Sequence, residues 1–135
     1  MYATIGKWEP EYLLSDPQGA SPIAISCTPN NGTLKRGQIM KREANGMYAP
    51  AAAADIVNTN HLVVLDEVVD TTASAEIAAD ARAYRAGRMI ESKLLIAGND
   101  TLTAAHKLVL RQQGILTDVL MEDAAEFNNS TAATR

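Results

Sequence analysis

The pattern of apolar and polar residues predicts a β-rich middle section that begins with a tight hairpin. In residues 34–50, LKRGQIMKREANGMYAP, the pair Asn45-Gly46 separates two short runs that contain apolar residues. Asn and Gly tolerate the positive φ angles of a type I′ turn, so the pair predicts a two-residue hairpin loop. Pro50 has no N–H to donate to a ladder, so we expect the second strand to end there.

Two further features concern the strands near this hairpin. Leu34 and Ile39 are five positions apart, and a β-bulge at Gly37 would place both on one face of the first strand. Residues 62–65 (LVVL) form an apolar, largely β-branched run, which predicts a buried strand.

Residues 75–86 (AEIAADARAYRA) satisfy two patterns at once. Ala, Glu and Arg favour a helix, and intrinsic propensity alone predicts one. The alternation of Arg82, Tyr84 and Ala86 with their neighbours also permits a strand that ends at Gly87. The residues themselves leave this choice open.

The strongest helical pattern covers residues 101–113 (TLTAAHKLVLRQQ). Asp100 or Thr101 can cap the first N–H groups, and Gly114 stands where helices often end in a left-handed residue. Apolar residues three or four positions apart predict the face that packs on the sheet, namely Leu102, Ala105, Leu108 and Val109.

The chain divides into three sections. Residues 1–30 contain four prolines, each of which opposes helix and central strand, so we expect an extended N-terminal arm. Residues 31–122 carry the β-rich domain, and the polar section 123–135 is expected to be a disordered tail. Two apolar patches in the arm are expected to dock on another protein. The alternative is that Trp8 packs on the core of this domain. The patches comprise Trp8, Tyr12, Leu13, Leu14, Ile23 and Ile25.

Composition excludes several classes of partner. The formal net charge of −4 argues against a nucleic-acid partner, which requires a basic surface. No apolar run approaches the ~20 residues that span a bilayer, and the N-terminal sequence lacks the pattern of a signal peptide. We therefore expect no membrane partner and a protein made and kept in the cytosol. Aromatic residues are only 4% of the chain, so we expect a modest core that other subunits can complete.

Candidate catalytic and metal-binding residues are few. Cys27 is the only cysteine, which excludes an intrachain disulfide and a multi-cysteine zinc site. His61 and His106 each lack a second ligand three or four positions away. Asp70, in Asp-Thr-Thr, partly matches the aspartic protease motif, but the glycine of that motif is missing. We expect no cofactor, no metal and no enzymatic activity; the alternative is a small hydrolase that uses Cys27 or Asp70.

Four stretches follow one another between residues 34 and 115. They are Leu34-Lys35-Arg36-Gly37 leading through Asn45-Gly46 to Tyr48-Ala49-Pro50; Leu62 to Leu65 with Glu67 and Asp70-Thr71-Thr72; Ala83-Tyr84-Arg85-Ala86-Gly87 with Leu94; and the capped helix closing on Leu110-Arg111 and Gly114-Ile115. In this order and spacing the chain resembles the phage head decoration proteins of the lambda type.

The resemblance implies a mainly β fold with a minor helix (α+β), namely a compact β-tulip-like domain with an extended N-terminal arm. It also favours a strand over residues 81–86. The implied function is to bind the phage major capsid protein on the outer surface of the expanded head and to stabilise it against the pressure of packaged DNA. The implied assembly is a homotrimer at threefold and quasi-threefold positions of the virion, after synthesis in the host cytoplasm.

In this family the N-terminal segment meets the capsid, which suits the proline-rich arm. The expected capsid contacts are therefore the apolar residues of the arm, Trp8, Tyr12, Leu13, Leu14, Ile23 and Ile25. Another virion component, such as a connector or a fibre base, is the remaining alternative.

Overall fold

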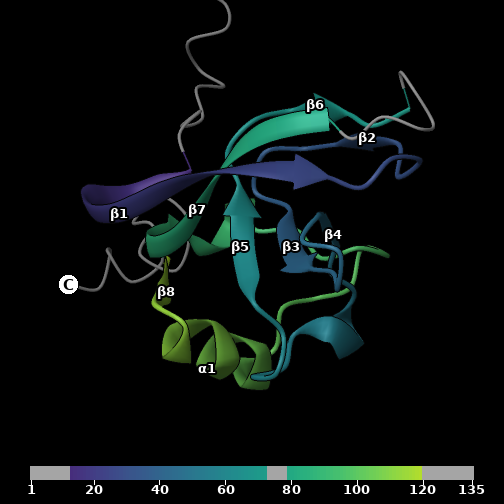
Figure 1. Cartoon of the computed structure of the whole chain (residues 1–135). Helices are drawn as coiled ribbons and strands as arrows, with labels where there is room; N and C mark the ends of the chain where they lie inside the picture. Colours follow the sequence, from purple (N-terminus) through teal and green to yellow (C-terminus); the bar gives the residue numbers. More distant parts are fainter. Residues whose placement is uncertain (1–12, 73–78, 120–135) are drawn as a thin grey trace, which may run out of the picture.

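The described part of the chain is mainly β and contains one α-helix. A computed structural model describes residues 13–72 and 79–119, which include eight strands (Figure 1). The helix is α1 (Ala104–Gln112), and two short 3-10 helices, η2 (Ala53–Asp55) and η3 (Glu91–Lys93), lie in connections. The prediction of a mainly β fold with a minor helix (α+β) is therefore confirmed.

Strand β7 (Ala79–Ile90) holds three other strands together. Along one edge it pairs antiparallel with β1 (Leu14–Cys27). Along its other edge it pairs antiparallel with β5 (Leu62–Leu65) and, further on, parallel with β8 (Ile115–Asp118). Segments from the start, middle and end of the described chain thus meet at one strand (Figure 1).

The main sheet closes on itself. Its order is β1-β4-β3-β5-β7-β8, where β3 is Ile39–Arg42 and β4 is Tyr48–Pro50, and β1 also pairs with β7. Five strands therefore form a ring, and β8 continues the sheet outside it. The β1–β4 side of the ring is held near Cys27, which pairs with Tyr48. A separate two-stranded sheet joins β2 (Thr33–Leu34) to β6 (Val69–Asp70).

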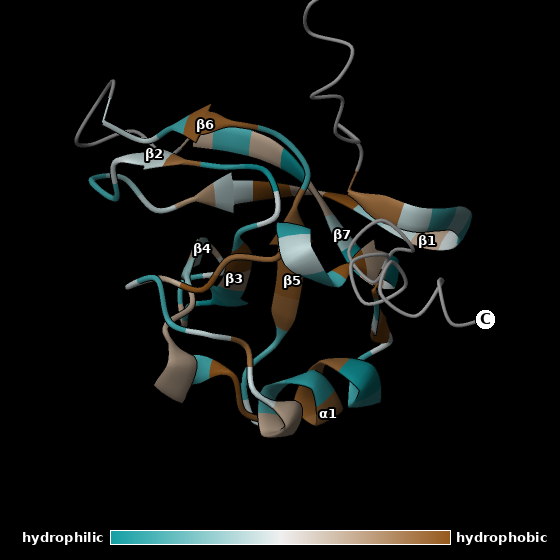
Figure 2. Ribbon diagram, turned by 180° about the vertical axis from the view of Figure 1, so that it is seen from behind, coloured by the Kyte–Doolittle hydropathy of each residue, from teal (hydrophilic) through white to brown (hydrophobic). Residues whose placement is uncertain are grey.

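The core has two halves, which lie on opposite faces of β3 and β5. Successive residues of a strand point to opposite faces, and all four residues of β5 are buried, which explains its continuous apolar run (Figure 2). The half that includes α1 contains Leu13, Ile39, Ala51, Ile56, Leu62, Val64, Met89, Leu94, Ile96, Leu110 and Ile115. The other half contains Ile25, Cys27, Leu34, Met40, Tyr48, Val63, Leu65, Val69, Ala81 and Ala83.

Residues 14–27 of the predicted arm form strand β1, so the arm prediction is wrong for this section. Two prolines had argued against a strand there. The pairing register with β7 jumps between Asp16 and Ser21, and Pro17 lies in this jump. Another register shift falls directly before Pro22. Strands tolerate proline at such places, because the ladder needs no N–H from it.

The strand alternative for residues 75–86 is the one the structure adopts, from Ala79 onward. Ala81 and Ala83 are buried, whereas Asp80 and Arg82, which alternate with them, are exposed. This two-residue period outweighs the helical propensity of alanine and arginine, because the pairing with β1 and β5 satisfies the backbone on both edges.

The hairpin predicted at Asn45-Gly46 forms, but its turn is not the two-residue type I′ turn. The Gly46 N–H donates to the Glu43 carbonyl (2.9 Å), and of the pair only Gly46 has a positive φ, 90°. This is a three-residue loop with a left-handed glycine. Asn45 instead accepts a hydrogen bond on its side chain from the Met47 N–H (3.0 Å). The second strand ends at Pro50, as predicted.

The β-bulge predicted at Gly37 is present. The Gly37 N–H donates to the Leu65 carbonyl (2.8 Å), and the Leu65 N–H donates to the Gln38 carbonyl (2.9 Å), so two residues oppose one. Gly37 has a φ of 98°. The bulge does not bring Leu34 and Ile39 to one face, since they belong to different sheets and to different halves of the core.

The predicted helix forms as α1, but with a different inner face. It begins later than expected, because Thr103 is its N-cap and accepts a hydrogen bond from the His106 N–H. Leu110 is fully buried, whereas Leu108 is 56% exposed and Ala105 is exposed as well. Of the predicted face, Leu102 and Val109 pack against the core. The prediction is therefore wrong for Ala105 and Leu108 only.

Some predictions fall outside the described residues. These are the first twelve residues of the predicted arm and the expectation of a disordered tail over residues 123–135. In the described ranges, none of the helices is long and apolar enough to cross a membrane.

Candidate interaction surface

The residues expected to contact a partner separate into three groups. Leu13 and Ile25 are buried in the two halves of this domain's own core, so the expectation that they contact a capsid is wrong for this conformation. Leu14 and Ile23 are partly buried and pack against the same halves. Trp8 and Tyr12 lie outside the described residues.

Leu13, the first residue that the structure describes, is held in the domain by both its side chain and its backbone. Its side chain is 1% exposed, and its carbonyl accepts a hydrogen bond from the Ile90 N–H (2.9 Å). Leu13 thus belongs to the domain itself.

A polar bulge interrupts β1 soon after this point. Four residues of the bulge, from Asp16 to Gly19, are exposed. The Asp16 carboxylate accepts a hydrogen bond from the Gln18 N–H (3.0 Å), and Gly19 has a φ of 83°. Further along, Ala20 packs closely on Gly87. A Cβ added to Gly87 would lie 3.1 Å from the Cα of Ala20. The sequence Asp-Pro-Gln-Gly is typical of a turn, and this signal could have identified the bulge.

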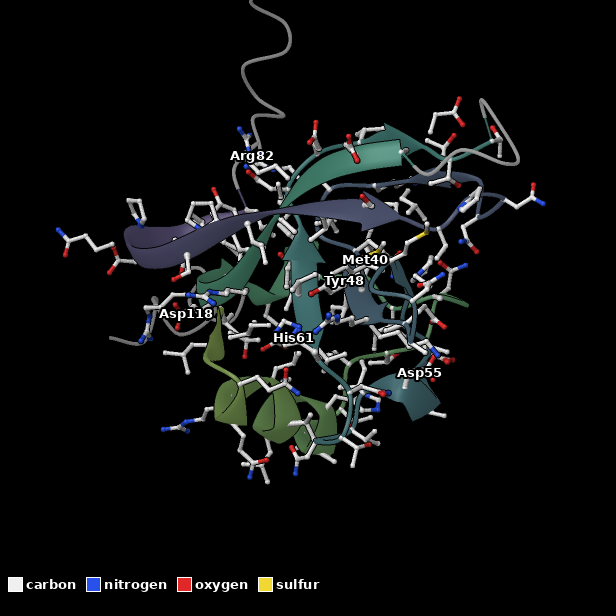
Figure 3. All side chains as sticks on the ribbon, viewed as in Figure 1. Met40, Tyr48, Asp55, His61, Arg82 and Asp118 are labelled. Carbon is white, nitrogen blue, oxygen red and sulfur yellow. The ribbon has the colours of Figure 1, made fainter. Side chains whose placement is uncertain are left out.

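A carboxylate at the end of β8 ties β1, β7 and β8 together. Asp118, labelled in Figure 3, accepts two hydrogen bonds from Arg88, at 2.9 Å from Nε and 2.8 Å from the terminal nitrogen. The Ser15 hydroxyl donates to the same carboxylate (2.5 Å). These bonds lower the pKa of Asp118 from its ordinary value. The bond from Arg88 contributes most, and the bond from Ser15 comes next. The beginning of β1 is therefore held in place by charge-assisted bonds.

A second carboxylate, which unlike Asp118 is buried, holds the opposite part of β7. The Asp66 side chain is 2% exposed and accepts hydrogen bonds from Arg36 Nε (2.9 Å) and Arg82 Nε (3.0 Å). Burial, followed by the nearby charge of Asp66, raises the pKa of Tyr84. Arg82 and Arg88, which lie in one basic sequence cluster, thus pair with different acids of their own chain.

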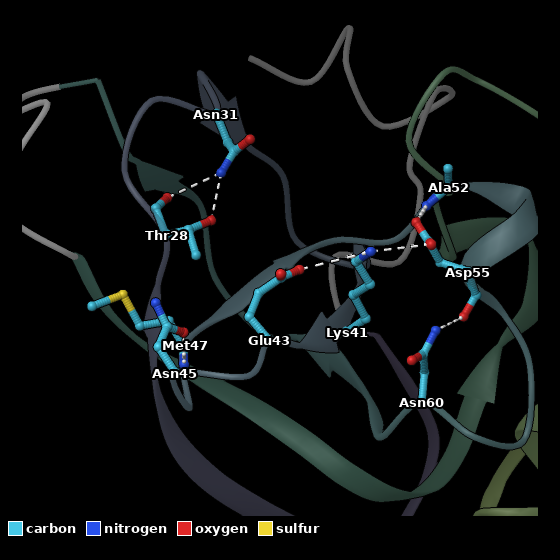
Figure 4. A network of polar contacts seen from close by, with 9 residues as sticks. All are labelled: Thr28, Asn31, Lys41, Glu43, Asn45, Met47, Ala52, Asp55 and Asn60. Carbon is cyan, nitrogen blue, oxygen red and sulfur yellow. Dashed lines mark hydrogen bonds and ion pairs between the residues drawn. The ribbon is translucent and has the colours of Figure 1, made fainter.

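A third polar network supports the loop that contains η2 (Figure 4). Lys41 on β3 donates to Asp55 (3.1 Å) and lies 3.7 Å from a carboxylate oxygen of Glu43. Asp55 also accepts the Ala52 N–H (3.0 Å), and its backbone carbonyl accepts from the Asn60 side chain (2.8 Å). The Ala52 bond contributes most to a lowered pKa of Asp55. Each polar group here binds another group of this domain, on β3, beside it or in the loop, so the network is structural.

The two candidate nucleophiles are in unsuitable environments. Cys27 is fully buried, and desolvation, followed by the charges of Asp80 and Glu67, raises the pKa of its thiol to about 11. The reactive thiolate is therefore scarce at neutral pH. Asp70 is exposed, and hydrogen bonds from Thr72 lower its pKa, so it is ionised rather than sharing a proton with a second acid.

Both histidines have partners within the domain. His61 Nδ1 lies 3.1 Å from the Tyr48 hydroxyl, and His106 Nδ1 accepts the N–H of Thr103 at the start of α1 (3.1 Å). Across residues 13–72 and 79–119, no three His, Cys, Asp or Glu side chains gather in a way that could hold a metal ion.

No protein-family model matches this chain, and no curated protein matches its sequence. A functional assignment must therefore come from the residues and from the geometry described above.

Proposed function

We propose that this protein is a phage head decoration protein that binds the outer surface of the expanded head. It binds the major capsid protein as homotrimers at threefold and quasi-threefold positions and stabilises the shell against the pressure of packaged DNA. Its domain is then of the β-tulip type.

Strand β7 is the observation that carries this proposal. Local propensity over residues 75–86 favours a helix, whereas the resemblance to lambda-type decoration proteins requires a strand over residues 81–86. The chain has a strand at Ala79–Ile90. The other stretches that carry the resemblance occur as β2 to β6, α1 and β8 in the same order.

The proposed contact with the capsid lies at the N-terminus, before Leu13. Burial of Leu13 and Ile25 removes them from the contact, which leaves Trp8 and Tyr12 as aromatic anchors. The exposed polar bulge at residues 16–19 follows directly and offers a second contact. Several weak contacts of this kind, repeated in each subunit of a trimer, sum through multivalency.

Stabilising a shell requires no chemical reaction, and the environments of the two candidate nucleophiles agree with that. Cys27 is buried and its thiol protonated, and Asp70 is an exposed, ionised carboxylate. Localisation to the virion surface, with synthesis in the host cytoplasm, follows from the same proposal.

Electron cryo-microscopy of expanded heads that lack a decoration protein provides the test. Full-length protein should add density at threefold and quasi-threefold positions. Bare threefold positions at saturating protein would reject the proposal, and density confined to one vertex would assign the chain to a connector instead.

A deletion of residues 1–12 tests the contact separately. A longer deletion through residue 20 would remove Leu13 and the start of β1, and it would confuse binding with folding. The shorter deletion should abolish head binding but retain the urea unfolding transition of the full chain. Normal binding by this variant would move the contact away from the N-terminus, and the Trp8→Ala variant shows whether the aromatic side chain is the anchor.

A further inference from the structure

Two Asn-Gly pairs occur in this chain, and both lie in loops that the structure describes. They are Asn31-Gly32, between β1 and β2, and Asn45-Gly46, in the hairpin between β3 and β4. The backbone nitrogen that follows an asparagine can attack the side-chain carboxamide, and glycine has no side chain that hinders the approach. Both asparagines are exposed to solvent, so exposure alone does not distinguish the two pairs.

The Asn45 side chain is held close to the peptide nitrogen of Gly46. Its Oδ1 accepts a hydrogen bond from the Met47 N–H (3.0 Å), as Figure 4 shows. The ring closed by this bond contains both the Asn45 Cγ and the Gly46 nitrogen. The bond also places a donor on the oxygen that becomes negative when Cγ is attacked. None of the described residues lies within 4 Å of a Cβ built at Gly46, so water can reach the pair.

The backbone bonds that close this loop join residues 43 to 47. The Glu43 N–H donates to the Met47 carbonyl (2.7 Å), and the Gly46 N–H donates to the Glu43 carbonyl (2.9 Å). Release of the second bond frees the Gly46 nitrogen and leaves the pairing of β3 with β4 intact. Local openings of this kind at the tip of a loop cost far less free energy than global unfolding.

The pair Asn31-Gly32, in contrast, is tied to a segment far away in the sequence. The Asn31 N–H donates to the Thr71 hydroxyl (2.8 Å), and the Gly32 carbonyl accepts from both the N–H (3.0 Å) and the hydroxyl (2.7 Å) of Thr71. The Asn31 amide nitrogen, which would leave, donates to the carbonyl (3.1 Å) and the hydroxyl (2.6 Å) of Thr28 (Figure 4). Thr71 is 1% exposed. Opening of this pair therefore breaks tertiary bonds and costs more than opening of the hairpin loop.

We propose that Asn45 is a site of spontaneous deamidation in the folded protein and that the fold protects Asn31. The Gly46 nitrogen bonds to the Asn45 Cγ and gives its proton to water or hydroxide. The bond from Cγ to Nδ2 then breaks, and Nδ2 takes up a proton from solvent and leaves as ammonia. Water opens the resulting succinimide at either carbonyl, which yields aspartate or isoaspartate. The reaction requires only water, and the inference does not depend on the capsid proposal.

The products change the hairpin in charge and in backbone length. Either product adds a negative charge close in sequence to Glu43. Isoaspartate also adds a carbon atom to the backbone between β3 and β4, next to the paired residues Arg42 and Tyr48. Tyr48 is also the residue through which β4 pairs with β1. Deamidation of Asn45 therefore alters the loop beside the point where the ring of strands closes.

Incubation of the full-length native protein in mildly alkaline buffer tests this proposal. Peptide mass spectrometry measures the reaction at each pair, with fragmentation that distinguishes isoaspartate from aspartate. Asn45 should react at least about tenfold faster than Asn31. In denaturing urea the bonds to Thr71 are lost, and the two rates should become similar. Equal rates in the native protein, no reaction at Asn45, or a difference that persists unchanged in urea would each overturn the proposal.

Substitutions provide the matched controls. Thr71→Val removes the hydroxyl that binds both residues of Asn31-Gly32, and it should raise the rate at Asn31 several-fold without changing the rate at Asn45. Thr28→Val, at a half-buried position, removes the other hydroxyl and keeps the test decisive if the Thr71 variant is unstable. Asn45→Gln lengthens the side chain and should leave position 45 unmodified. If neither threonine variant raises the rate at Asn31, the fold does not protect this residue and the proposal is overturned.

Discussion

The α-carbon of Gly37 faces the backbone carbonyl of Lys93 with no room for a side chain between them. A Cβ at this position would overlap the carbonyl oxygen, and the backbone is also left-handed there, with a φ of 98°. The bulge before β3 and the last residue of η3 thus make a close backbone contact that only glycine permits.

We predict that Gly37→Ala destabilises the protein by more than about 2 kcal/mol, since it combines left-handed strain with a backbone clash. Gly46→Ala is the matched control: its φ is 90°, but nothing lies within 4 Å of the added Cβ. This control should cost only about 1 kcal/mol. Urea unfolding of both variants measures the difference, and equal losses would show that the contact with Lys93 relaxes.

The buried carboxylate of Asp66 predicts a second stability effect. Replacing Asp66 by Ala removes hydrogen bonds to Arg36 and Arg82, and we expect a loss of about 1–3 kcal/mol. Both arginine side chains keep partial access to water, which limits the cost. Asp100→Ala, at an exposed position, should change the unfolding free energy by less than about 0.5 kcal/mol. A loss no larger than that of the control would contradict the assigned role of Asp66.

The lowered pKa of Asp118 predicts an acid dependence of stability. A carboxyl group whose pKa is lower in the folded state stabilises the fold at pH values above its pKa in the unfolded chain, about 3.9. This contribution is lost as the pH falls through the pKa of the folded state. Asp118→Asn should cost up to about 1 kcal/mol at neutral pH, because Arg88 is half exposed. Unfolding curves from neutral to acid pH should show the difference between variant and native protein shrinking. A constant difference would indicate that charge is not the cause.

The buried thiol of Cys27 predicts slow chemical modification. Its pKa of about 11 and its full burial leave little accessible thiolate at pH 8. A thiol reagent should therefore react with the native chain much more slowly than with the chain in denaturing urea. Rapid reaction of the native protein would mean that β1 opens readily and would revive a role for this cysteine as a nucleophile.

Several elements could be predicted from short stretches of sequence, because the forces that determine them act within a few residues. The apolar run of residues 62–65 became the buried strand β5. Residues that adopt or exclude particular backbone angles predicted the hairpin, the end of the hairpin's second strand at Pro50, and the bulge at Gly37. The end of α1 followed from Gly114, whereas its start is set by Thr103 and not by Asp100 or Thr101.

Much of the candidate surface could not be predicted in this way. Residues 14–27 were assigned to a separate arm because of Pro17 and Pro22, and the signal of a turn at residues 16–19 was missed. Two of the expected contacts, Leu13 and Ile25, became core residues once β1 joined the ring of strands. Burial of these side chains depends on elements far away in the sequence, which no local pattern describes.

The sequence by itself determined where the chain turns and which short runs are apolar enough to be buried. Tertiary structure alone decided that residues 79–90 form a strand, because alanine and arginine have too weak a preference to oppose pairing with β1 and β5. It also decided that Leu110, and not Leu108, faces the core, since the rotation of a short helix follows from the surface on which it packs. The physical reason is the same in both cases: local preferences amount to tenths of a kcal/mol per residue, up to ~1, whereas burial of one large side chain contributes about 1.5–3 kcal/mol.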